Sequence, residues 1–197
     1  MAMGKTTLAK SDRTRQRILD AAAAAFREHG VDRVGVRDVM KLAGLTRGGF
    51  YFHFADKDTL LAEATREAAR SNAASHCRWA GDAPKGKKLQ AFIKHYLSEE
   101  HRDNPQVGCL LAALGSEIGR SSASQREAFT DGMDAIVEQI ATLVPGANAA
   151  ERRIRAGLLI SSMAGVLTTS RALSDRPRSN ALLAAARQFY SATFAEA

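Results

Sequence analysis

Several residue types are scarce in this sequence, and each scarcity excludes a class of protein. The 197 residues include two cysteines, Cys77 and Cys109, too few for a disulfide framework or a cysteine-rich metal site. There are four prolines, and alternating runs of Val, Ile and Thr are nearly absent, which disfavours a β-sheet protein. No apolar run approaches the roughly 18 residues that a membrane span requires.

Residues 1–15 also lack the apolar segment of a signal peptide. We therefore expect a cytoplasmic protein with no membrane partner and with both thiols reduced.

Catalytic and metal-binding patterns are missing too. The five histidines have no metal-ligand spacing, and nothing resembles a nucleophile elbow or a phosphate-binding glycine loop. Glu99, Glu100 and His101 are expected to form the solvated polar end of a helix. The sequence thus predicts no enzymatic activity, no bound metal and no cofactor.

Alanine, leucine and basic side chains are abundant instead. The sequence is 45% hydrophobic and 25% charged, which is enough to bury a core and favours an all-α fold. Of the formal net charge of +7, +5 lies in residues 1–50, where ten Lys or Arg face five Asp or Glu. This asymmetry fits a polyanion partner, although an ordinary basic protein explains the charge equally well.

Apolar periodicity and capping residues predict about nine helices. We expect a flexible basic arm over residues 1–10, then a first helix capped by Ser11 or Asp12 and ended by Gly30. Residues 11–55 are predicted to form a helix-turn-helix domain, and residues 56–197 a larger helical domain. The later helices are expected at about 36–43, 46–52, 56–75, 89–97, 109–119, 125–143, 149–172 and 179–194.

The stretch over residues 36–57, VRDVMKLAGLTRGGFYFHFADK, organises the rest. A helix stops at Gly44, and a very short one follows, with Thr46 as its cap. Gly48 and Gly49 would each cost a helix about 1 kcal/mol, but missing side chains let a backbone approach DNA closely. A small shared core is expected from Phe26, Val39, Met40, Leu45, Phe50 and Phe54.

Helix, tight turn and helix is how a protein places a helix end in the DNA major groove. Arg47 can reach a guanine edge with two parallel bonds, whereas Thr46 and Tyr51 suit phosphate oxygens. Further phosphate contacts are expected from Arg37, His53 and Lys57. The alternative is that Tyr51, Phe52, His53 and Phe54 only form an aromatic plug between domains.

Three segments resemble the DNA-binding region of the TetR family of bacterial regulators: Arg37-Asp-Val, Ala43-Gly-Leu-Thr-Arg-Gly-Gly-Phe-Tyr-Phe-His-Phe and Lys57-Asp-Thr-Leu. The resemblance covers about residues 12–62. It implies a homodimer that binds a palindromic operator, usually as a repressor released by a small ligand. It also implies DNA contacts from Arg37, Thr46, Arg47, Tyr51, His53 and Lys57. Gly35 and Gly49 depart from the family pattern, so any contact made there by other members is absent.

The last two expected helices are apolar on more than one side, which favours pairing with a second copy over a monomeric core. In the family resembled, the dimer forms at these helices. The residues predicted for this dimer interface are Leu159, Met163, Val166, Leu182, Ala186, Phe189 and Tyr190.

An effector cavity is expected between the fifth to eighth helices, and its apolar lining would suit a hydrophobic or aromatic ligand. A filled core with no pocket is the alternative. The predicted lining is Phe92, Tyr96, Cys109, Leu110, Leu114, Phe129, Met133, Ile136 and Met163.

Cys109 opens a helix, where exposed N–H groups can stabilise a thiolate. The segment Gly108-Cys-Leu-Leu-Ala-Ala-Leu-Gly-Ser-Glu resembles a subset of TetR-like regulators, some of which sense electrophiles or oxidants. The alternative is a small buried thiol. Together the features predict a dimeric, ligand-responsive repressor. The competing hypothesis is a helical ligand-binding or enzymatic protein without sequence-specific DNA binding.

Overall fold

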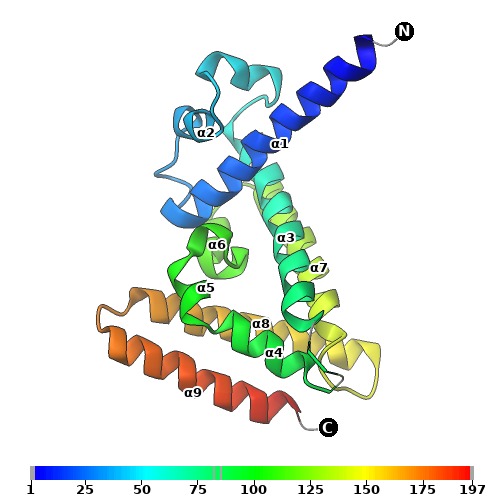
Figure 1. Ribbon diagram of the computed structural model, residues 1–197, viewed down its shortest axis with the longest axis vertical. Helices are drawn as coiled ribbons and strands as arrows, with labels where there is room; N and C mark the ends of the chain where they lie inside the picture. The colour runs from blue at the N-terminus through cyan, green and yellow to red at the C-terminus, as the bar shows by residue number, and fades with distance from the viewer. Residues whose placement is uncertain (1–2, 82, 85, 196–197) are drawn as a thin grey trace.

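The computed structural model describes residues 3–81, 83–84 and 86–195, with side chains except at 3–10, 76, 77 and 195. This part of the chain is all-α, as expected, with α1 and α2 at one end, α8 and α9 at the other and the long α3 joining them (Figure 1). The described elements are α1 (Met3–His29), α2 (Val36–Leu42), the 3₁₀ helix η1 (Arg47–Phe52), α3 (Lys57–Gly81), α4 (Lys88–Tyr96), α5 (Glu99–Asp103), the 3₁₀ helix η2 (Pro105–Val107), α6 (Leu110–Ile118), α7 (Ala123–Ala141), α8 (Ala149–Ala172) and α9 (Arg176–Ala195).

Several predicted boundaries hold because a residue with a specific conformation sets them. Gly30 and Gly44 adopt positive φ values of 84° and 67°, the left-handed conformation that ends a helix. Asp56 accepts a bond from the Thr59 N–H at 2.7 Å and so caps α3. Helix α8 covers the predicted 149–172.

Two predicted boundaries are wrong. Helix α1 begins at Met3 and therefore includes most of the segment expected to be a flexible arm. No proline interrupts residues 3–29, and a capping residue at Ser11 favours a helix start without requiring one. Helix α3 continues past Ser75 to Gly81, because nothing before the glycine breaks it.

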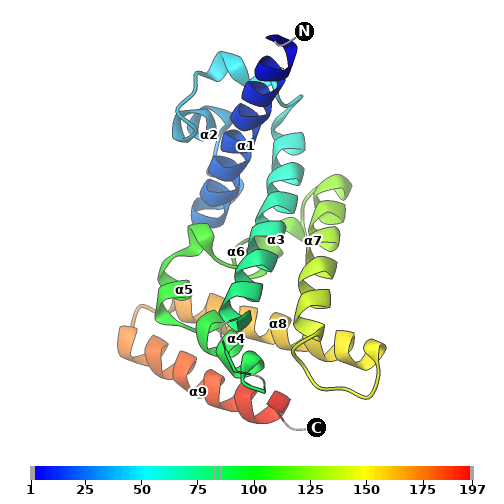
Figure 2. The same ribbon diagram turned by 45° about the vertical axis from the view of Figure 1, so that its right-hand side comes forward.

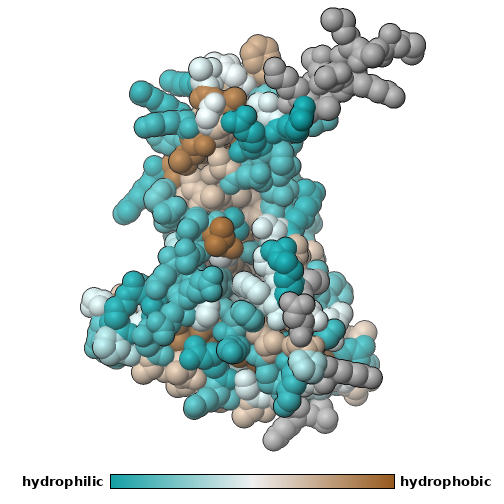
Figure 3. Space-filling model, viewed as in Figure 1, coloured by the Kyte–Doolittle hydropathy of each residue, from teal (hydrophilic) through white to brown (hydrophobic). Residues whose placement is uncertain are grey.

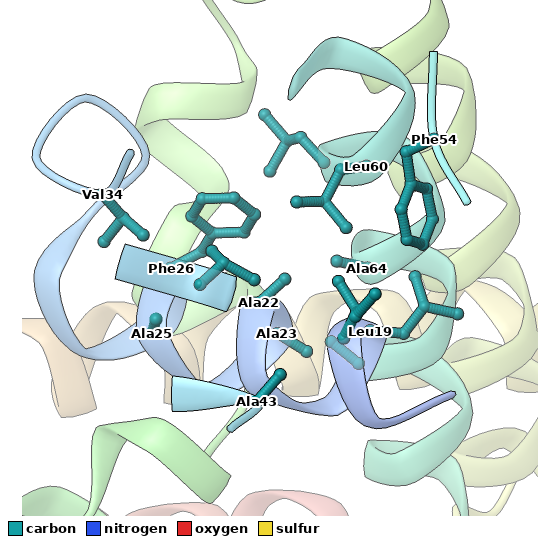
Figure 4. Close-up of a cluster of buried hydrophobic side chains, with 14 of the residues drawn as sticks. Leu19, Ala22, Ala23, Ala25, Phe26, Val34, Ala43, Phe54, Leu60 and Ala64 are labelled. Carbon is teal, nitrogen blue, oxygen red and sulfur yellow. The ribbon is translucent and has the colours of Figure 1, made fainter. Parts of the chain in front are cut away.

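The N-terminal elements pack around one hydrophobic cluster. Figure 4 shows Phe26 of α1, Phe54 after η1 and Leu60 of α3 directed toward one another. The six-residue core predicted for this region is confirmed, with Leu45 partly buried at its edge. The cluster also includes Leu110 and Ile118 of α6. The N-terminal helices are therefore packed against the later helices, α4 to α9, which we call the body. The predicted domain division at residues 55 and 56 stays a prediction.

Helices α3 and α7 run side by side and form the long axis of the molecule (Figure 2). A Cβ atom added at Gly132 of α7 would lie 2.5 Å from the Cβ atom of Ala69 on α3. Only glycine opposite alanine lets the two helices approach this closely.

A second hydrophobic cluster lies between α4, α7, α8 and α9 and includes Phe92, Tyr96 and Met163. In the described part of the chain, no helix has a stretch that is long and apolar enough to span a membrane.

The structure of residues 99–108 differs from the sequence prediction. His101 was expected on a solvated face, but it is 6% exposed and belongs to α5. Its Nε2 atom accepts a hydrogen bond from the Cys109 N–H at 2.9 Å, and its Nδ1 atom lies 2.6 Å from the Tyr96 carbonyl oxygen. Nδ1 therefore holds the proton, and the imidazole is neutral. The polar residues beside it in the sequence could not reveal this burial.

Burial lowers the pKa of His101 from 6.5 to about 4, against the opposing effect of the Tyr96 carbonyl. Between these pH values the unfolded chain binds the proton and the folded chain does not, so stability falls as the pH falls. We expect His101 to account for a loss of about 2 kcal/mol in the free energy of unfolding between pH 7 and pH 5. Urea unfolding at both pH values would measure it.

His101→Gln is expected to lose less stability than the wild type over this interval. Equal losses in His101→Gln and the wild type would contradict the assignment.

Candidate nucleic-acid interface

The predicted recognition helix is a 3₁₀ helix of six residues, not an α-helix. Thr46 occupies its N-cap position, but its side chain makes no capping bond and is exposed. Arg47 and Gly48 are also exposed. The element therefore presents a hydroxyl and a guanidinium to solvent on one short turn.

Gly48 and Gly49 are not required by the fold of the free protein. Neither has a positive φ. A Cβ atom at Gly48 would meet nothing within 4 Å, and one at Gly49 would make an ordinary contact of 3.7 Å with Met40. Side chains could be accommodated at both positions, so the reason for glycine lies outside the packing of this chain.

The aromatic cluster divides into buried and exposed members. Phe50 and Phe54 are 0% and 2% exposed and stack with ring centroids 5.7 Å apart, as predicted for core residues. Tyr51 and Phe52 are 66% and 89% exposed. The alternative of a four-residue plug is therefore wrong for Tyr51 and Phe52. Hydrophobic residues gather near this end of the face drawn in Figure 3, which is otherwise mostly hydrophilic.

The basic residues expected to contact phosphate differ in their exposure and in the hydrogen bonds that they already make. Arg37 is exposed on the first turn of α2, whereas Lys57 is partly buried at the start of α3. The Lys57 Nζ atom donates to the Val31 carbonyl oxygen at 2.7 Å. Lys57 thus fixes the turn between α1 and α2 in the free chain. Val31 and Lys57 are 26 residues apart, so the sequence does not reveal this role.

Arg17 has a similar positioning role that sequence patterns do not reveal. Its guanidinium donates to the Ala43 carbonyl oxygen at 2.6 Å and so fastens α1 to the end of α2. A cation at a helix C-terminus is favourable, because the last carbonyl groups have no partner within the helix.

The nine residues predicted to line an effector cavity are divided between the two hydrophobic clusters. Leu110 and Leu114 belong to the N-terminal cluster, whereas Phe92, Tyr96, Cys109, Ile136 and Met163 belong to the other. Phe129 and Met133 are packed against the N-terminal and the second cluster respectively. The described hollows are lined by other residues. In the free chain these apolar stripes pack into two clusters, and an effector cavity lined by them stays a prediction.

The predicted dimer interface also needs correction. Leu159 and Met163 are 0% exposed, and Ala186 and Tyr190 are 8% and 7% exposed, because they pack α8 and α9 together within the chain. Buried residues offer no surface to a partner. Phe189 is 62% exposed, and Ile154 and Leu158 of α8 are exposed to a similar degree. Val166 and Leu182 are partly buried.

Cys109 is the N-cap residue of α6 and is 1% exposed. Two arginines of distant elements, Arg27 and Arg171, lie near enough for their charges to act on it. Burial lowers the pKa of both guanidinium groups. Within the described residues, Arg27 and Arg171 donate to carbonyl oxygens and not to any carboxylate. The side chain of Cys77 lies outside the described part of the structure.

Known proteins share both the N-terminal segment and the fold. Residues 18–64 match the model of the bacterial regulatory proteins of the tetR family. Over 61 residues, the chain is 41% identical to the HTH-type transcriptional regulator AcrR of Shigella flexneri. That match covers 31% of this chain and 28% of AcrR, so the chain spans under a third of this curated relative.

Solved structures share the whole fold at low identity. A TetR-family transcriptional regulator from Cytophaga hutchinsonii has a TM-score of 0.76 at 18% identity, covering 95% of this chain and 98% of its own. The reduced form of E. coli NemR has a TM-score of 0.74 at 17% identity, covering 90% and 94%. The segment over residues 18–64 is thus similar to the DNA-binding region of the tetR family of bacterial regulatory proteins, and the whole chain shares the all-α fold of solved TetR-family regulators.

Proposed function

We propose that the chain is a transcriptional repressor that binds a palindromic DNA operator as a homodimer and is released by an effector acting on the body. The exposed polar face of η1, mounted on the buried Phe50 and Phe54, is the observation that supports DNA binding most directly. The glycines at 48 and 49 add to it, because close approach to DNA explains residues that the packing does not require.

The proposed contacts follow from chemistry and from exposure, with His53 and Lys57 partly buried and the other residues exposed. Arg47 reads a guanine edge, and Thr46, Tyr51, His53 and Arg37 bind phosphate oxygens. Lys57 contributes at the start of α3 while it holds the Val31 carbonyl. Phe52 is the additional apolar group on this surface, and an exposed phenylalanine suits the methyl group of thymine.

The homodimer is proposed to form through α8 and α9, which lie at the opposite end of the molecule from η1 (Figures 1 and 2). Ile154 and Leu158 follow at helical spacing on α8, and Phe189 adds an exposed ring on α9. A partner that covers these side chains would remove apolar surface from water. This revised set replaces the buried residues predicted from the sequence.

The body is joined to the DNA-binding end by polar contacts as well as by packing. The Glu117 carboxylate at the end of α6 accepts from the Val31 N–H at 2.7 Å. Gln125 of α7 donates to Asp58 of α3 at 2.7 Å. A shift of α6 or α7 would therefore move α1 and α3, and with them η1. Two half-sites about 34–36 Å apart, or a multiple of this, then lose simultaneous contact.

Arg47→Ala is expected to lose about tenfold discrimination at one operator position, since a bidentate guanine contact gives roughly 1–3 kcal/mol. Arg37→Ala is expected to weaken binding to all sequences alike and to reduce the salt slope by about 1. Fluorescence anisotropy with an operator and its single-base variants, over a range of salt concentrations, measures both effects.

Lys94→Ala is the charge-matched control, because Lys94 is exposed on α4 in the body. It is expected to bind DNA like the wild type. If Arg37→Ala relaxed base preference and Arg47→Ala weakened all sequences alike, the roles of the two arginines would be wrong. Equal wild-type binding to every duplex would disprove operator recognition.

Leu158→Glu is expected to shift the protein from dimer to monomer, because it places a charge in the proposed apolar interface. Light scattering coupled to size-exclusion chromatography reports the mass. Leu42→Glu alters a side chain of similar exposure, 63% against 62%, at the other end of the molecule and should remain dimeric. A Leu158→Glu protein that stays dimeric would exclude this face as the interface.

Modification of Cys109 is a second proposed trigger for release. Arg27 and Arg171 donate to carbonyl oxygens and to no carboxylate among the described residues, and both lie close enough for their charges to act on Cys109. A group added to a sulfur that is 1% exposed has no room in the packed core. Modification would therefore displace α6 and its contacts with α1 and α3.

With Cys77→Ser as background, iodoacetamide is expected to alkylate Cys109 and abolish operator binding, with iodide leaving and the thiol proton passing to solvent. Mass spectrometry gives the rate and anisotropy gives the binding. Cys109→Ser in the same background should keep operator binding after treatment. If alkylation is no faster than that of a free thiol and DNA binding survives, Cys109 is only a packed core residue.

A further inference from the structure

One polar and aromatic hollow lies at the edge of the second hydrophobic cluster, against which Trp79 packs. It has a volume of about 370 Å³ and sits where the C-terminal part of α3 meets the end of α4, α5 and η2. This size is sufficient for a small organic ligand. Its lining is Ser75, Arg78, Trp79, His95, Ser98, Glu100, His101, Asn104 and Val107.

The walls of this hollow, which we call the Trp79 pocket, are aromatic. The indole of Trp79 lies nearly parallel to the His95 ring, with an interplanar angle of 13° and centroids 6.1 Å apart. The His101 ring lies 5.5 Å from the indole centroid at 59°. Flat rings with apolar faces favour a flat aromatic ligand, which gains stacking and buried area together.

The rim of the Trp79 pocket is polar and of mixed charge. Arg78 and Glu100 are exposed there, and Ser75 and Ser98 are part of the lining, with their hydroxyl oxygens accepting from the Arg78 guanidinium and the His101 backbone N–H. A ligand with one hydroxyl, carboxylate or ring nitrogen at its edge would find a donor or an acceptor. Both ring nitrogens of His101 are already engaged, so its contribution to a ligand is the ring itself.

His101 also connects the Trp79 pocket to the DNA-binding end. Its Nε2 atom holds the Cys109 N–H, and the carbonyl of the preceding Gly108 accepts from Arg27 at 3.2 Å and from Asn72 at 3.0 Å. Arg27 belongs to α1 and Asn72 to α3. The packing around Gly108 is tight, because a Cβ atom added there would lie 3.0 Å from the His101 ring. A displaced His101 therefore changes the contacts that position α1 and α3.

We propose that the Trp79 pocket is the effector site, and that it binds planar fused-ring aromatic compounds with a polar group at one edge. This assignment rests on the proposed function for its regulatory meaning. The bound ring stacks on Trp79 and presses on His101. The hydrogen bonds from His101 through Cys109 and Gly108 to Arg27 and Asn72 carry the displacement to the DNA-binding helices.

Trp79 is the one tryptophan among the 197 residues, so intrinsic tryptophan fluorescence reports directly on this pocket. The probes are 2-naphthol, 4-hydroxyquinoline and indole-3-carboxylate, with decahydro-2-naphthol as the saturated analogue of the first. Calorimetry and Trp79 fluorescence are expected to detect at least one aromatic probe with a Kd below about 1 mM and to show weaker binding of the saturated analogue.

Two substitutions that introduce the same aromatic side chain test where the probe binds. Val107→Phe fills the Trp79 pocket from its exposed rim, whereas Thr142→Phe alters an exposed position that lines other hollows. Probe affinity is expected to fall at least tenfold in Val107→Phe and to stay unchanged in Thr142→Phe. Equal affinities in both variants, equal binding of the saturated analogue, or no binding of any aromatic probe would overturn the assignment.

Regulation is tested separately from binding. A saturating probe is expected to weaken operator affinity of the wild type at least tenfold. Arg27→Lys, whose folding is verified by circular dichroism, should bind the probe equally well but release the operator less. An unchanged operator affinity in the wild type, or full release in Arg27→Lys, would overturn the proposed route. Failure of the probe-free protein to recognise any operator would instead refute the proposed function, while probe binding would still decide the site.

Discussion

The carbonyl group of Gly108 is the contact on which the relation between the two ends of the molecule depends. It accepts hydrogen bonds from Arg27 of α1 and Asn72 of α3, and Asn72 also accepts from the Leu110 N–H at 2.8 Å. One buried peptide segment thus joins α1, the long helix α3 and the start of α6. Because leaving any of these polar groups unpaired would be costly, the three elements are constrained to move together.

The same region concentrates positive charge with few carboxylates beside it in the described part of the chain. Arg27 and Arg171 are satisfied by carbonyl groups, and Arg102 by Asp103, which Arg176 also contacts. The bonds from Arg102 and Arg176 hold the pKa of Asp103 well below its usual range. Asp103 is therefore paired with Arg102 and Arg176. Among the described residues, no carboxylate binds the guanidinium groups of Arg27 and Arg171 near Cys109. A site of this kind responds to any change that adds or removes charge or volume beside it.

Short-range chemistry made much of this structure predictable from sequence. Gly30, Gly44 and Asp56 set helix ends through their own backbone and capping properties, and apolar spacing indicated Phe50 and Phe54 as core. The failures at His101 and at the apolar stripes depended on distant partners. His101 looked like part of a polar helix end, and its burial arises from packing against Trp79 and from Cys109, which follows it by eight residues. The apolar stripes were identified correctly, but periodicity cannot say which of two cores a residue such as Leu110 joins.

Under the proposed function, the shortness of η1 makes the distance between its two copies an effective means of control. Six residues at about 2.0 Å each give a rise of about 12 Å, which is comparable to three or four base pairs. Such an element contributes few side chains to DNA, and two of its positions are glycine. Tight binding then requires two copies acting together, so that the second contact is effectively intramolecular. When the separation no longer matches the operator, this gain disappears although neither copy of η1 has changed. In the proposed mechanism, small shifts through Gly108 and α3 would therefore be sufficient for regulation.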